Sequence, residues 1–329
     1  MRYSFCNRFK SGGRLKLLVT GSSGFVGSAF VEFAESRGDV CIKQRRSLCG
    51  ESDNTIFLAD LSSSTDWSLA LKGVECVVHC AAIVHQMKGV SEIEVYRRAN
   101  TEGTLVLARQ AAEAGVKRFV FVSSIKVNGE TTDSGSPFKS DVLAAPSDPY
   151  GLSKYEAEKQ LRLLSLETGM ELVIVRPPLV YGPGVKANFH AMMNWVNKGI
   201  PLPLRYSANK RSFVFLQNLV DLLWRCTRHP NASGNTFLVS DDEDVSTSEL
   251  LEGMAAALDK KAILVYVPRC LIEGLAGLIG KKAISNRLFG NLQVDISDTK
   301  KILGWEPPFS MKQGLAATAK AFLTQSRTE

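Results

Sequence analysis

The chain has 329 residues, of which 45% are hydrophobic and 22% are charged, and its formal net charge at pH 7 is +7. This composition is typical of an ordinary soluble globular protein that is large enough for one big domain or two lobes. The positive charge suits a small anionic ligand, whereas a nucleic-acid-binding function is disfavoured because the basic residues are scattered rather than clustered.

The cysteines and the segments most like targeting signals indicate a cytoplasmic protein. The seven cysteines form no CxxC pair, and Cys76 and Cys80 fall in an apolar run that predicts a buried strand, so we expect reduced thiols. Residues 1–14 are polar and basic without an apolar core, which predicts a loose N-terminal extension rather than a signal peptide. Residues 262–280 are interrupted by a proline and by charged side chains, so we expect no stable membrane insertion. The four histidines lack metal-ligand spacing, and no metal site is expected.

A short apolar run, residues 15–20, leads directly into the glycine-rich turn GSSGFVG and then into an apolar-periodic segment. This order predicts a strand, a turn and a helix. Gly21 permits the tight turn, Gly24 lets a phosphate approach the backbone, and Gly27 lets helix and strand pack closely. The free N–H groups of the helix's first turn then form an anion site for a pyrophosphate. The pattern therefore predicts a dinucleotide site rather than a plain turn.

Strands alternate with helices as far as residue 176. We expect strands at 39–42, 56–61, 75–82, 119–124 and 172–175, helices at 95–115 and 150–168, and a loop over 126–149. This alternation predicts an α/β fold, a Rossmann-type doubly wound parallel sheet covered on both faces, over residues 15–176. Beyond Pro177 the pattern becomes irregular, with turns at Pro201 and Pro203 and mixed short elements. Residues 177–329 therefore predict a smaller mixed α/β lobe, with some segments returning to the first domain, that closes over the carboxyl ends of the strands.

Tyr150 and Lys154 lie four residues apart, on one face of the predicted helix. An unperturbed tyrosine has a pKa near ~10, but a nearby ammonium and the positive ring of an oxidised nicotinamide both favour the phenolate. Such a group can exchange a proton with a sugar hydroxyl while hydride moves to or from a cofactor. The alternative is a surface pair on an ordinary helix. Because the pair follows a dinucleotide motif and a strand that ends in Ser123 and Ser124, we favour catalysis.

Taken together, these motifs resemble the extended short-chain dehydrogenase/reductase family, and within it the nucleotide-sugar epimerases, dehydratases and 4-keto-sugar reductases. The resemblance runs from about residue 15 to the end. It is carried by TGSSGFVG (20–27), VHCAA (78–82), NTEGT (100–104), FVSS (121–124), YGLSK (150–154), RPPLVYGP (176–183) and DTKKILGW (298–305). The phrases SSIKVNG and RPPLVYGPGVKANF are most similar to the branch that works on UDP-N-acetylhexosamine derivatives for surface polysaccharide.

The resemblance implies a role for individual residues. Tyr150 is implied as the general acid/base, Lys154 as the residue that holds the nicotinamide ribose and tunes Tyr150, and Ser124 as a hydrogen-bond partner of the reacting sugar oxygen. Lys126 is implied to help through its backbone. Asp60 is implied to bind adenine, Ala81 and Ala82 to line the cofactor wall, and Asn100 to support that wall. The other implied cofactor contacts are Gly21, Ser23, Gly24, Phe25, Val26, Gly27, Leu61 and Pro177. Asn100 fits a helix cap equally well. The implied contacts of the substrate diphosphate are Asn188 and Arg211, with Arg287 as a weaker candidate.

Three departures from the family pattern bear on the reaction. Dehydratases carry Asp-Glu directly after the active-site Ser/Thr, and this chain has Ile and Lys there, which disfavours a 4,6-dehydratase. NAD-retaining epimerases have an acidic residue at the end of the second strand, and this chain has Gln44 followed by Arg45 and Arg46. A guanidinium there could accept a 2′-phosphate, which predicts an NADP-compatible pocket rather than a solvated basic loop, with NAD as the alternative. Leu179 replaces the family asparagine at the substrate diphosphate.

The first hypothesis is therefore an NADPH-consuming reductase of the 4-keto group of a UDP-linked, N-acetylated sugar. The alternative is a UDP-hexose or UDP-N-acetylhexosamine 4-epimerase, which uses the same residues with a retained NAD. A non-catalytic NADP(H)-binding sensor or scaffold is disfavoured because Ser124, Tyr150 and Lys154 occur together. A nucleotide sugar is the expected partner, and a homodimer is expected by analogy with the family.

Overall fold

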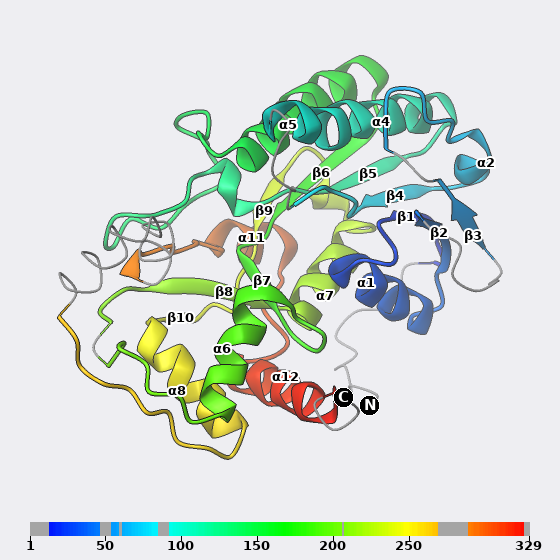
Figure 1. The fold of residues 1–329 in the computed structure, drawn as a ribbon. Coiled ribbons are helices and arrows are strands. Elements are labelled where there is room, and N and C mark those ends of the chain that lie inside the picture. Colours follow the sequence, from blue (N-terminus) through cyan, green and yellow to red (C-terminus); the bar gives the residue numbers. More distant parts are fainter. Residues whose placement is uncertain are drawn as a thin grey trace.

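The computed structural model describes residues 13–46, 54–58, 61–84, 92–205, 207–268 and 289–325. Within these ranges, no helix combines the length and the apolar character needed to cross a bilayer. A large sheet runs through the upper half of the molecule with helices on both faces, and a smaller lobe lies below it (Figure 1). This arrangement confirms the predicted α/β architecture with a smaller mixed lobe.

The large sheet has seven parallel strands in the order β3-β2-β1-β4-β5-β6-β9. The strands are β1 (Lys16–Thr20), β2 (Val40–Arg45), β3 (Thr55–Phe57), β4 (Cys76–His79), β5 (Arg118–Val122), β6 (Glu171–Arg176) and β9 (Thr236–Leu238). The reversal of strand order at β1 and β4 makes the crevice at their carboxyl ends the natural ligand site of such a sheet. Because all strands are parallel, the residues that follow β1, β4, β5 and β6 meet at this one edge.

Two helical layers cover the sheet, one on each face. Successive side chains of a strand point to opposite faces, and here both sets are apolar, so both faces need cover. Leu17 and Val19 of β1 pack in one core cluster and Leu18 between them packs in the other. The first cluster is shared with α1 (Phe25–Ser36), α7 (Leu216–Cys226) and α11 (Ser297–Leu303). The second is shared with α2 (Ser68–Leu71), α4 (Gly103–Glu113) and α5 (Pro149–Thr168).

The segment predicted as one helix over 95–115 is interrupted. It begins as α3 (Glu92–Tyr96), widens into a π-helical turn at Arg97–Glu102 and continues as α4. The wide turn buries Asn100 and Thr101, and the Thr101 hydroxyl donates to the carbonyl of Ser153 on α5 at 2.9 Å. The spacing of apolar residues in a sequence is too coarse to reveal one extra residue in a helical turn, so it predicts a single continuous helix here. Such turns are often found at functional sites.

The smaller lobe is more regular than its sequence suggests. A mixed sheet in the order β10-β8-β7 consists of β7 (Leu179–Tyr181), β8 (Arg211–Phe215) and β10 (Asp244–Val245). Packed with it are α6 (Ala187–Asn197), α8 (Thr247–Ala257) and α12 (Met311–Gln325), which share a third core cluster. These helices have 11, 11 and 15 residues, where we expected mixed short elements. The sequence does contain one recognisable helix-start pattern in this lobe, the capping box of Ser246 and Glu249 at the beginning of α8.

Candidate active site

The glycine turn between β1 and α1 has no room for side chains at its first and third glycines. Gly21 has a φ of +64°, and a Cβ there would lie 2.9 Å from the backbone of Ala81. A Cβ on Gly27 would lie 2.2 Å from the carbonyl oxygen of Gly21. Helix α1 starts after Gly24 without a side-chain cap and without an acidic residue in its first turn. The positive end of this helix is therefore open to an anion.

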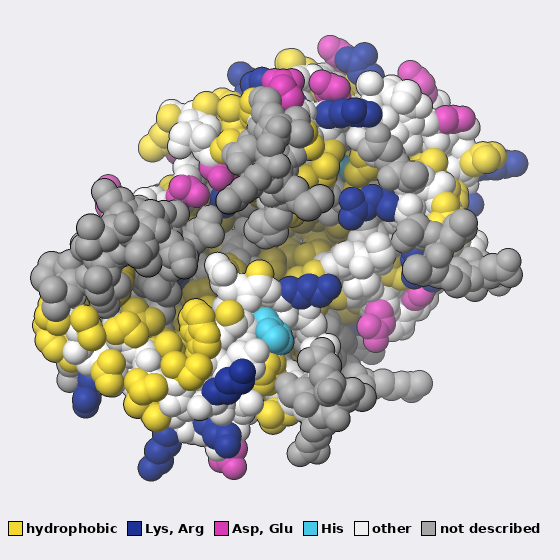
Figure 2. Space-filling view, in the orientation of Figure 1, with side chains coloured by type: hydrophobic (Ala, Val, Ile, Leu, Met, Phe, Trp, Pro, Cys, Tyr) yellow, Lys and Arg dark blue, Asp and Glu magenta, His cyan; other side chains and the backbone are white. Residues whose placement is uncertain are grey.

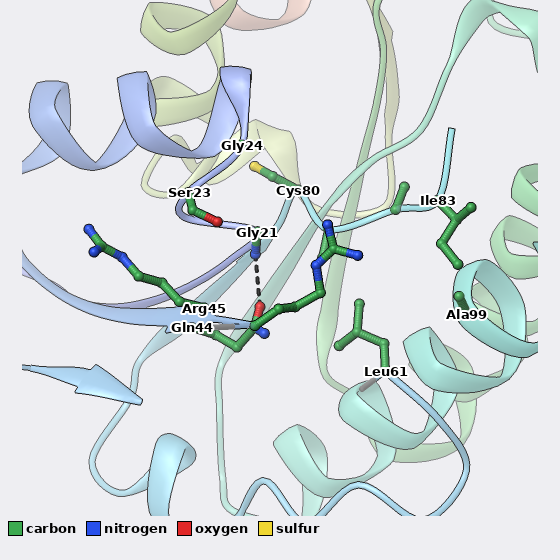
Figure 3. A pocket seen from close by; sticks show the side chains of 12 residues that line it. Gly21, Ser23, Gly24, Gln44, Arg45, Leu61, Cys80, Ile83 and Ala99 are labelled. Atoms are coloured by element: carbon green, nitrogen blue, oxygen red, sulfur yellow. Dashed lines mark hydrogen bonds between the residues drawn. The ribbon is translucent and has the colours of Figure 1, made fainter. Parts of the chain in front are cut away.

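A cavity of about 220 Å³ lies directly beside this turn (Figure 3). It is lined by Gly21, Ser23, Gly24, Gln44, Arg45, Arg46, Leu61, Cys80, Ala81, Ala82, Ile83 and Ala99. Eight of the predicted cofactor residues are among them, whereas Phe25 and Val26 pack against the hydrophobic core. The cavity is not lined by Gly27, Asn100, Tyr150, Lys154 or Pro177. Asp60 and Arg287 lie outside the described residues.

Sequence reasoning missed four residues of this lining: Gln44, Cys80, Ile83 and Ala99. Each of the four stands next to a predicted contact in the sequence, so adjacency is the signal that could have found them. Ala99 comes from the π-helical turn. The surface is hollowed between the large sheet and the smaller lobe, and Lys and Arg side chains lie around this hollow (Figure 2).

Gln44 is 1% exposed, and both ends of its side-chain amide form hydrogen bonds within the protein. Its amide oxygen accepts from the backbone N–H of Gly21 at 2.9 Å, and its amide nitrogen donates to the carbonyl of Leu58 at 3.0 Å. Gln44 thus holds the glycine turn against the end of β2. Among the described residues, the lining contains two arginines and no carboxylate, which favours an anionic ligand.

His79 at the end of β4 joins the glycine turn to α4. Its Nδ1 lies 2.7 Å from the Thr20 hydroxyl and its Nε2 lies 2.9 Å from the Thr104 hydroxyl. Thr104 donates its own proton to the carbonyl of Asn100, so it accepts from Nε2–H, and Nδ1 accepts from Thr20. Burial lowers the pKa of His79 to about 3, which agrees with this neutral form. Thr20 also accepts from the N–H of Ala81 and so fixes the cavity wall.

Asn100 supports the same wall from the π-helical turn. It is fully buried, accepts from the N–H of Ile83 at 2.8 Å, and donates to the carbonyl of Ile83 at 3.0 Å. The same amide donates to the hydroxyl of Ser153, which in turn donates to the carbonyl of Tyr150. Asn100 lies within the turn rather than at a helix end, so its contacts are those of a wall support and not of a cap.

Tyr150 lies in the first turn of α5, which Asp148 caps by accepting from the N–H of Gly151 at 2.8 Å. Burial, with a smaller contribution from the Asp148 carboxylate, raises the pKa of Tyr150 to about 12, and its hydrogen bond with the Ser124 hydroxyl acts in the opposite direction. Lys154 is not among the groups that shift this pKa. In the protein alone burial dominates, so the pKa of Tyr150 is raised and not lowered as we expected.

Lys154 is 1% exposed and points beneath the edge of the sheet. Its ammonium donates to the carbonyl of Val122 at 3.0 Å and lies 4.4 Å from the centre of the Phe121 ring. Burial lowers the pKa of Lys154 to about 8, while Cys80 and Glu158 act to raise it. An ammonium has three donors, and the carbonyl of Val122 takes one of them.

Ser124 stands at the end of β5 and is partly exposed, which leaves its hydroxyl accessible. The hydroxyl accepts from the N–H of Lys126, and the N–H of Ile125 donates to the carbonyl of Pro177 at 3.0 Å. The Lys126 side chain points to Asp148, with Nζ 2.8 Å from Oδ1. Ser124 therefore lies between the Pro177 segment and Tyr150.

The residues predicted at the substrate diphosphate come from the smaller lobe. Asn188 is exposed in the first turn of α6. Arg211 opens β8, and its guanidinium donates to the carbonyl of Gly290 at 2.9 Å. Leu179 on β7 is 39% exposed. None of these residues lines the cavity beside the glycine turn.

Comparisons with known proteins agree with this site. Residues 17–240 match the NAD dependent epimerase/dehydratase family. A UDP-glucose 4-epimerase of Vibrio cholerae is 50% identical over 312 residues, which are 93% of this chain and 95% of that protein. The N-acetyl-α-D-glucosaminyl-diphospho-ditrans,octacis-undecaprenol 4-epimerase of Escherichia coli O157:H7 is 25% identical over 321 residues, 92% of this chain and 93% of that protein.

A solved structure shares the fold. The UDP-N-acetylglucosamine 4-epimerase of Bacillus cereus superposes with a TM-score of 0.75 at 20% identity, over 94% of this chain and 99% of that one. The family match covers well over half of the chain and includes the glycine turn, Ser124, Tyr150 and Lys154. The chain therefore belongs to the NAD-dependent epimerase/dehydratase family and is an enzyme of the extended short-chain dehydrogenase/reductase type.

Proposed function

We propose that the protein is a UDP-hexose 4-epimerase that oxidises C4 of the sugar and reduces it again from the opposite face. The observation that carries this proposal is the 50% identity, over 93% of the chain, to the Vibrio cholerae protein named UDP-glucose 4-epimerase. The same similarity favours the epimerase over the 4-keto-sugar reductase that the basic ribose pocket led us to expect. Both reactions use the same three side chains, so the catalytic residues alone do not separate them.

The residues around the cavity fit a nicotinamide dinucleotide. The open helix end beside Gly24 suits a pyrophosphate. Ala81 and Ala82 line the cavity, and the N–H of Ala81 donates to the buried Thr20 hydroxyl. When bound, this cofactor accepts hydride from C4 and returns it. The Lys154 ammonium, with one donor on Val122, has donors left for ribose hydroxyls.

Proton transfer at the C4 oxygen falls to Tyr150, with the Ser124 hydroxyl positioning that oxygen. A pKa of about 12 keeps Tyr150 protonated at neutral pH when only protein groups surround it. The charge that would favour its phenolate in the loaded enzyme is the positive ring of an oxidised nicotinamide. Tyr150 therefore acts as a base only in the loaded enzyme, and it returns the proton as an acid when C4 is reduced.

We further infer that the pocket takes NADP more readily than NAD. Gln44 stands where a ribose-binding carboxylate would, its amide is committed to Gly21 and Leu58, and Arg45 and Arg46 line the cavity. A guanidinium binds a phosphate through two parallel hydrogen bonds. Denaturing freshly purified protein and identifying the released nucleotide tests this inference. Release of NADP supports the inference. Release of NAD would mean that Arg45 and Arg46 do not bind a 2′-phosphate, and it would not affect the epimerase proposal.

The reaction itself is tested with purified enzyme and UDP-glucose or UDP-N-acetylglucosamine, without added cofactor. NMR should show the C4 epimer accumulating to an equilibrium mixture. If neither sugar is converted, while NADPH is consumed stoichiometrically with a UDP-4-keto sugar, the reductase is the correct assignment. A protein that binds the nucleotide and moves no hydride with any of these substrates would be a sensor or scaffold.

A further inference from the structure

A buried ion pair joins the catalytic helix to the end of β6. Arg176 is 2% exposed and Glu158 is 3% exposed. The guanidinium donates through Nε to Oε1 at 2.9 Å and through Nη2 to Oε2 at 2.5 Å, a two-pronged geometry. Glu158 follows Lys154 by one turn of α5 and Arg176 directly precedes Pro177, so each charge is next to a residue of the site.

The carboxylate of Glu158 also holds the strand that carries Ser124. The Ser123 hydroxyl donates to Oε1 at 2.6 Å, and the N–H of Ser123 donates to the carbonyl of Val175 at 2.8 Å. The Glu158 side chain therefore contacts both β5 and β6 at the points where they enter the active site. Any movement of this carboxylate would shift Ser124 relative to Lys154.

On its other side, the guanidinium closes the loop 128–141. Nη1 of Arg176 donates to Oδ1 of Asn128 at 3.0 Å and to the carbonyl of Ser140 at 2.8 Å. The Asn128 amide then donates to the carbonyls of Lys139 and Asp141. The two ends of the loop are thus fastened to one buried charge. The loop begins directly after the turn that contains Lys126.

Stability alone does not explain this pair. The desolvation of two buried charges often exceeds their attraction, and well-packed apolar residues commonly stabilise a fold as much or more. What a buried, fully hydrogen-bonded pair provides is a single permitted geometry.

We propose that Glu158 and Arg176 are positioning residues, which fix Ser124, Lys154 and the loop 128–141 relative to one another for the 4-epimerase reaction. The expected kinetic effects rest on the proposed function. The expected structural effects rest on the geometry alone.

The pair also has an electrostatic consequence for Lys154. The groups that act on the pKa of Lys154 are the burial that lowers it and the Cys80 thiol and the Glu158 carboxylate that raise it. His79, on the neighbouring strand, is neutral, and Tyr150 is protonated in the protein alone. Without the charge of Glu158, the pKa of Lys154 falls further below its ordinary value.

The Glu158→Gln variant tests this consequence. The single amide oxygen of glutamine can still accept from Ser123 and from Nε of Arg176, so the shape of the side chain is kept. Its amide nitrogen cannot accept from Nη2, so the change removes the charge together with one of the two bonds to the guanidinium. We expect the alkaline limb of the pH profile of kcat/KM to move to lower pH by about one unit, while KM for the UDP-sugar at lower pH changes less than about twofold. A wild-type pH profile in this variant would overturn the electrostatic role of Glu158.

The Arg176→Lys variant tests the loop. Lysine keeps the charge but cannot contact Glu158, Asn128 and Ser140 at once. We expect backbone amides of residues 128–141 to exchange hydrogen about tenfold faster or more in mass-spectrometric exchange measurements, because the loop opens more often. Unchanged exchange over 128–141 would overturn the loop assignment. This measurement needs no substrate, so it stands even if the epimerase proposal fails.

A second buried pair supplies the matched control. Asp39 has a side chain 1% exposed and accepts from the N–H of Leu15, Nε1 of Trp224 and Nη2 of Arg228. It lies at the start of β2, at the opposite edge of the sheet from the site. Asp39→Asn should lower the melting temperature but leave the pH profile and the exchange of 128–141 unchanged. If Asp39→Asn produced the same shifts, general loosening of the fold would explain them and the positioning role would be refuted.

Discussion

The cofactor side and the sugar side of the site are built differently. On the cofactor side, buried polar side chains hold the backbone: Gln44 holds the glycine turn, and His79 and Asn100 hold the wall after β4. On the sugar side, the predicted contacts Asn188 and Arg211 come from separate elements, and Asn188 is exposed. Preorganised backbone tolerates little change, whereas a surface made of independent side chains loses affinity one contact at a time. We therefore expect substitutions on the cofactor side to have much larger effects on activity and stability than substitutions on the sugar side.

The largest effect is expected where the two sides meet, at Tyr150. Tyr150→Phe removes the hydroxyl that we propose transfers the proton, and it should lower kcat by about 10²- to 10⁴-fold. The amount of nucleotide released on denaturation should remain that of the wild type, because the ring still packs on Tyr96. Tyr155→Phe, one position beyond Lys154 on the same helix, is the control and should keep full activity. A fully active Tyr150→Phe enzyme would remove the catalytic assignment.

The rigidity of the cofactor side is tested by Gly27→Ala. The new Cβ would lie 2.2 Å from the carbonyl oxygen of Gly21, so either the turn or helix α1 must move. We expect a loss of about 1–3 kcal/mol in the free energy of unfolding and a purified protein that carries little nucleotide. Gly13→Ala, which meets nothing within 4 Å, should change neither quantity. Normal stability and nucleotide content in Gly27→Ala would show that the turn is more adaptable than its geometry indicates.

Arg45 and Arg46 at the cofactor cavity should contribute to nucleotide binding and not to the stability of the fold. Replacing Arg45 and Arg46 together by alanine should weaken NADP binding by about 10- to 100-fold, since hydrogen bonds to charged groups contribute about 1.5–3 kcal/mol. NAD binding should change far less. Fluorescence titration of nucleotide-free protein measures both, with Arg109→Ala on the exposed surface of α4 as the control. Equal weakening for both nucleotides would contradict a 2′-phosphate site.

His79 gives the cofactor wall a pH dependence. Its pKa of about 3 in the fold lies below the ordinary value of 6.5, so the unfolded chain binds the proton more readily. The stability that the neutral ring contributes is complete above about pH 6.5 and declines as the pH falls toward 3, by up to about 1.4 kcal/mol per unit. Urea unfolding on both sides of pH 6.5 should show a weaker pH dependence in His79→Gln than in the wild type. Parallel curves for the two proteins would mean that folding does not lower the pKa of His79.

The sequence predicts the local parts of the site well and the assembled parts poorly. The glycine turn and the Tyr150–Lys154 spacing lie within single segments, so their geometry follows from helix and turn rules. The sequence shows only that Gln44 stands where a ribose-binding carboxylate is expected. Its bonds to Gly21 and Leu58 depend on the tertiary structure, which places the end of β2 and the residue after β3 beside the turn. Burial is likewise a tertiary property, and it reverses the pKa shift expected for Tyr150.

The smallest effect is expected on the sugar side, at Asn188. Its exposed amide in the first turn of α6 can give the substrate diphosphate one hydrogen bond, and the surrounding backbone does not depend on it. Asn188→Ala should raise KM for the UDP-sugar about fivefold, in line with about 1 kcal/mol for one such bond, with kcat and nucleotide content unchanged. Asn231→Ala, an exposed asparagine in the Pro230–Ala232 turn, should leave KM unchanged. A large fall in kcat for Asn188→Ala would instead mean that α6 orients the sugar at Tyr150, and the sugar side would then be as preorganised as the cofactor side.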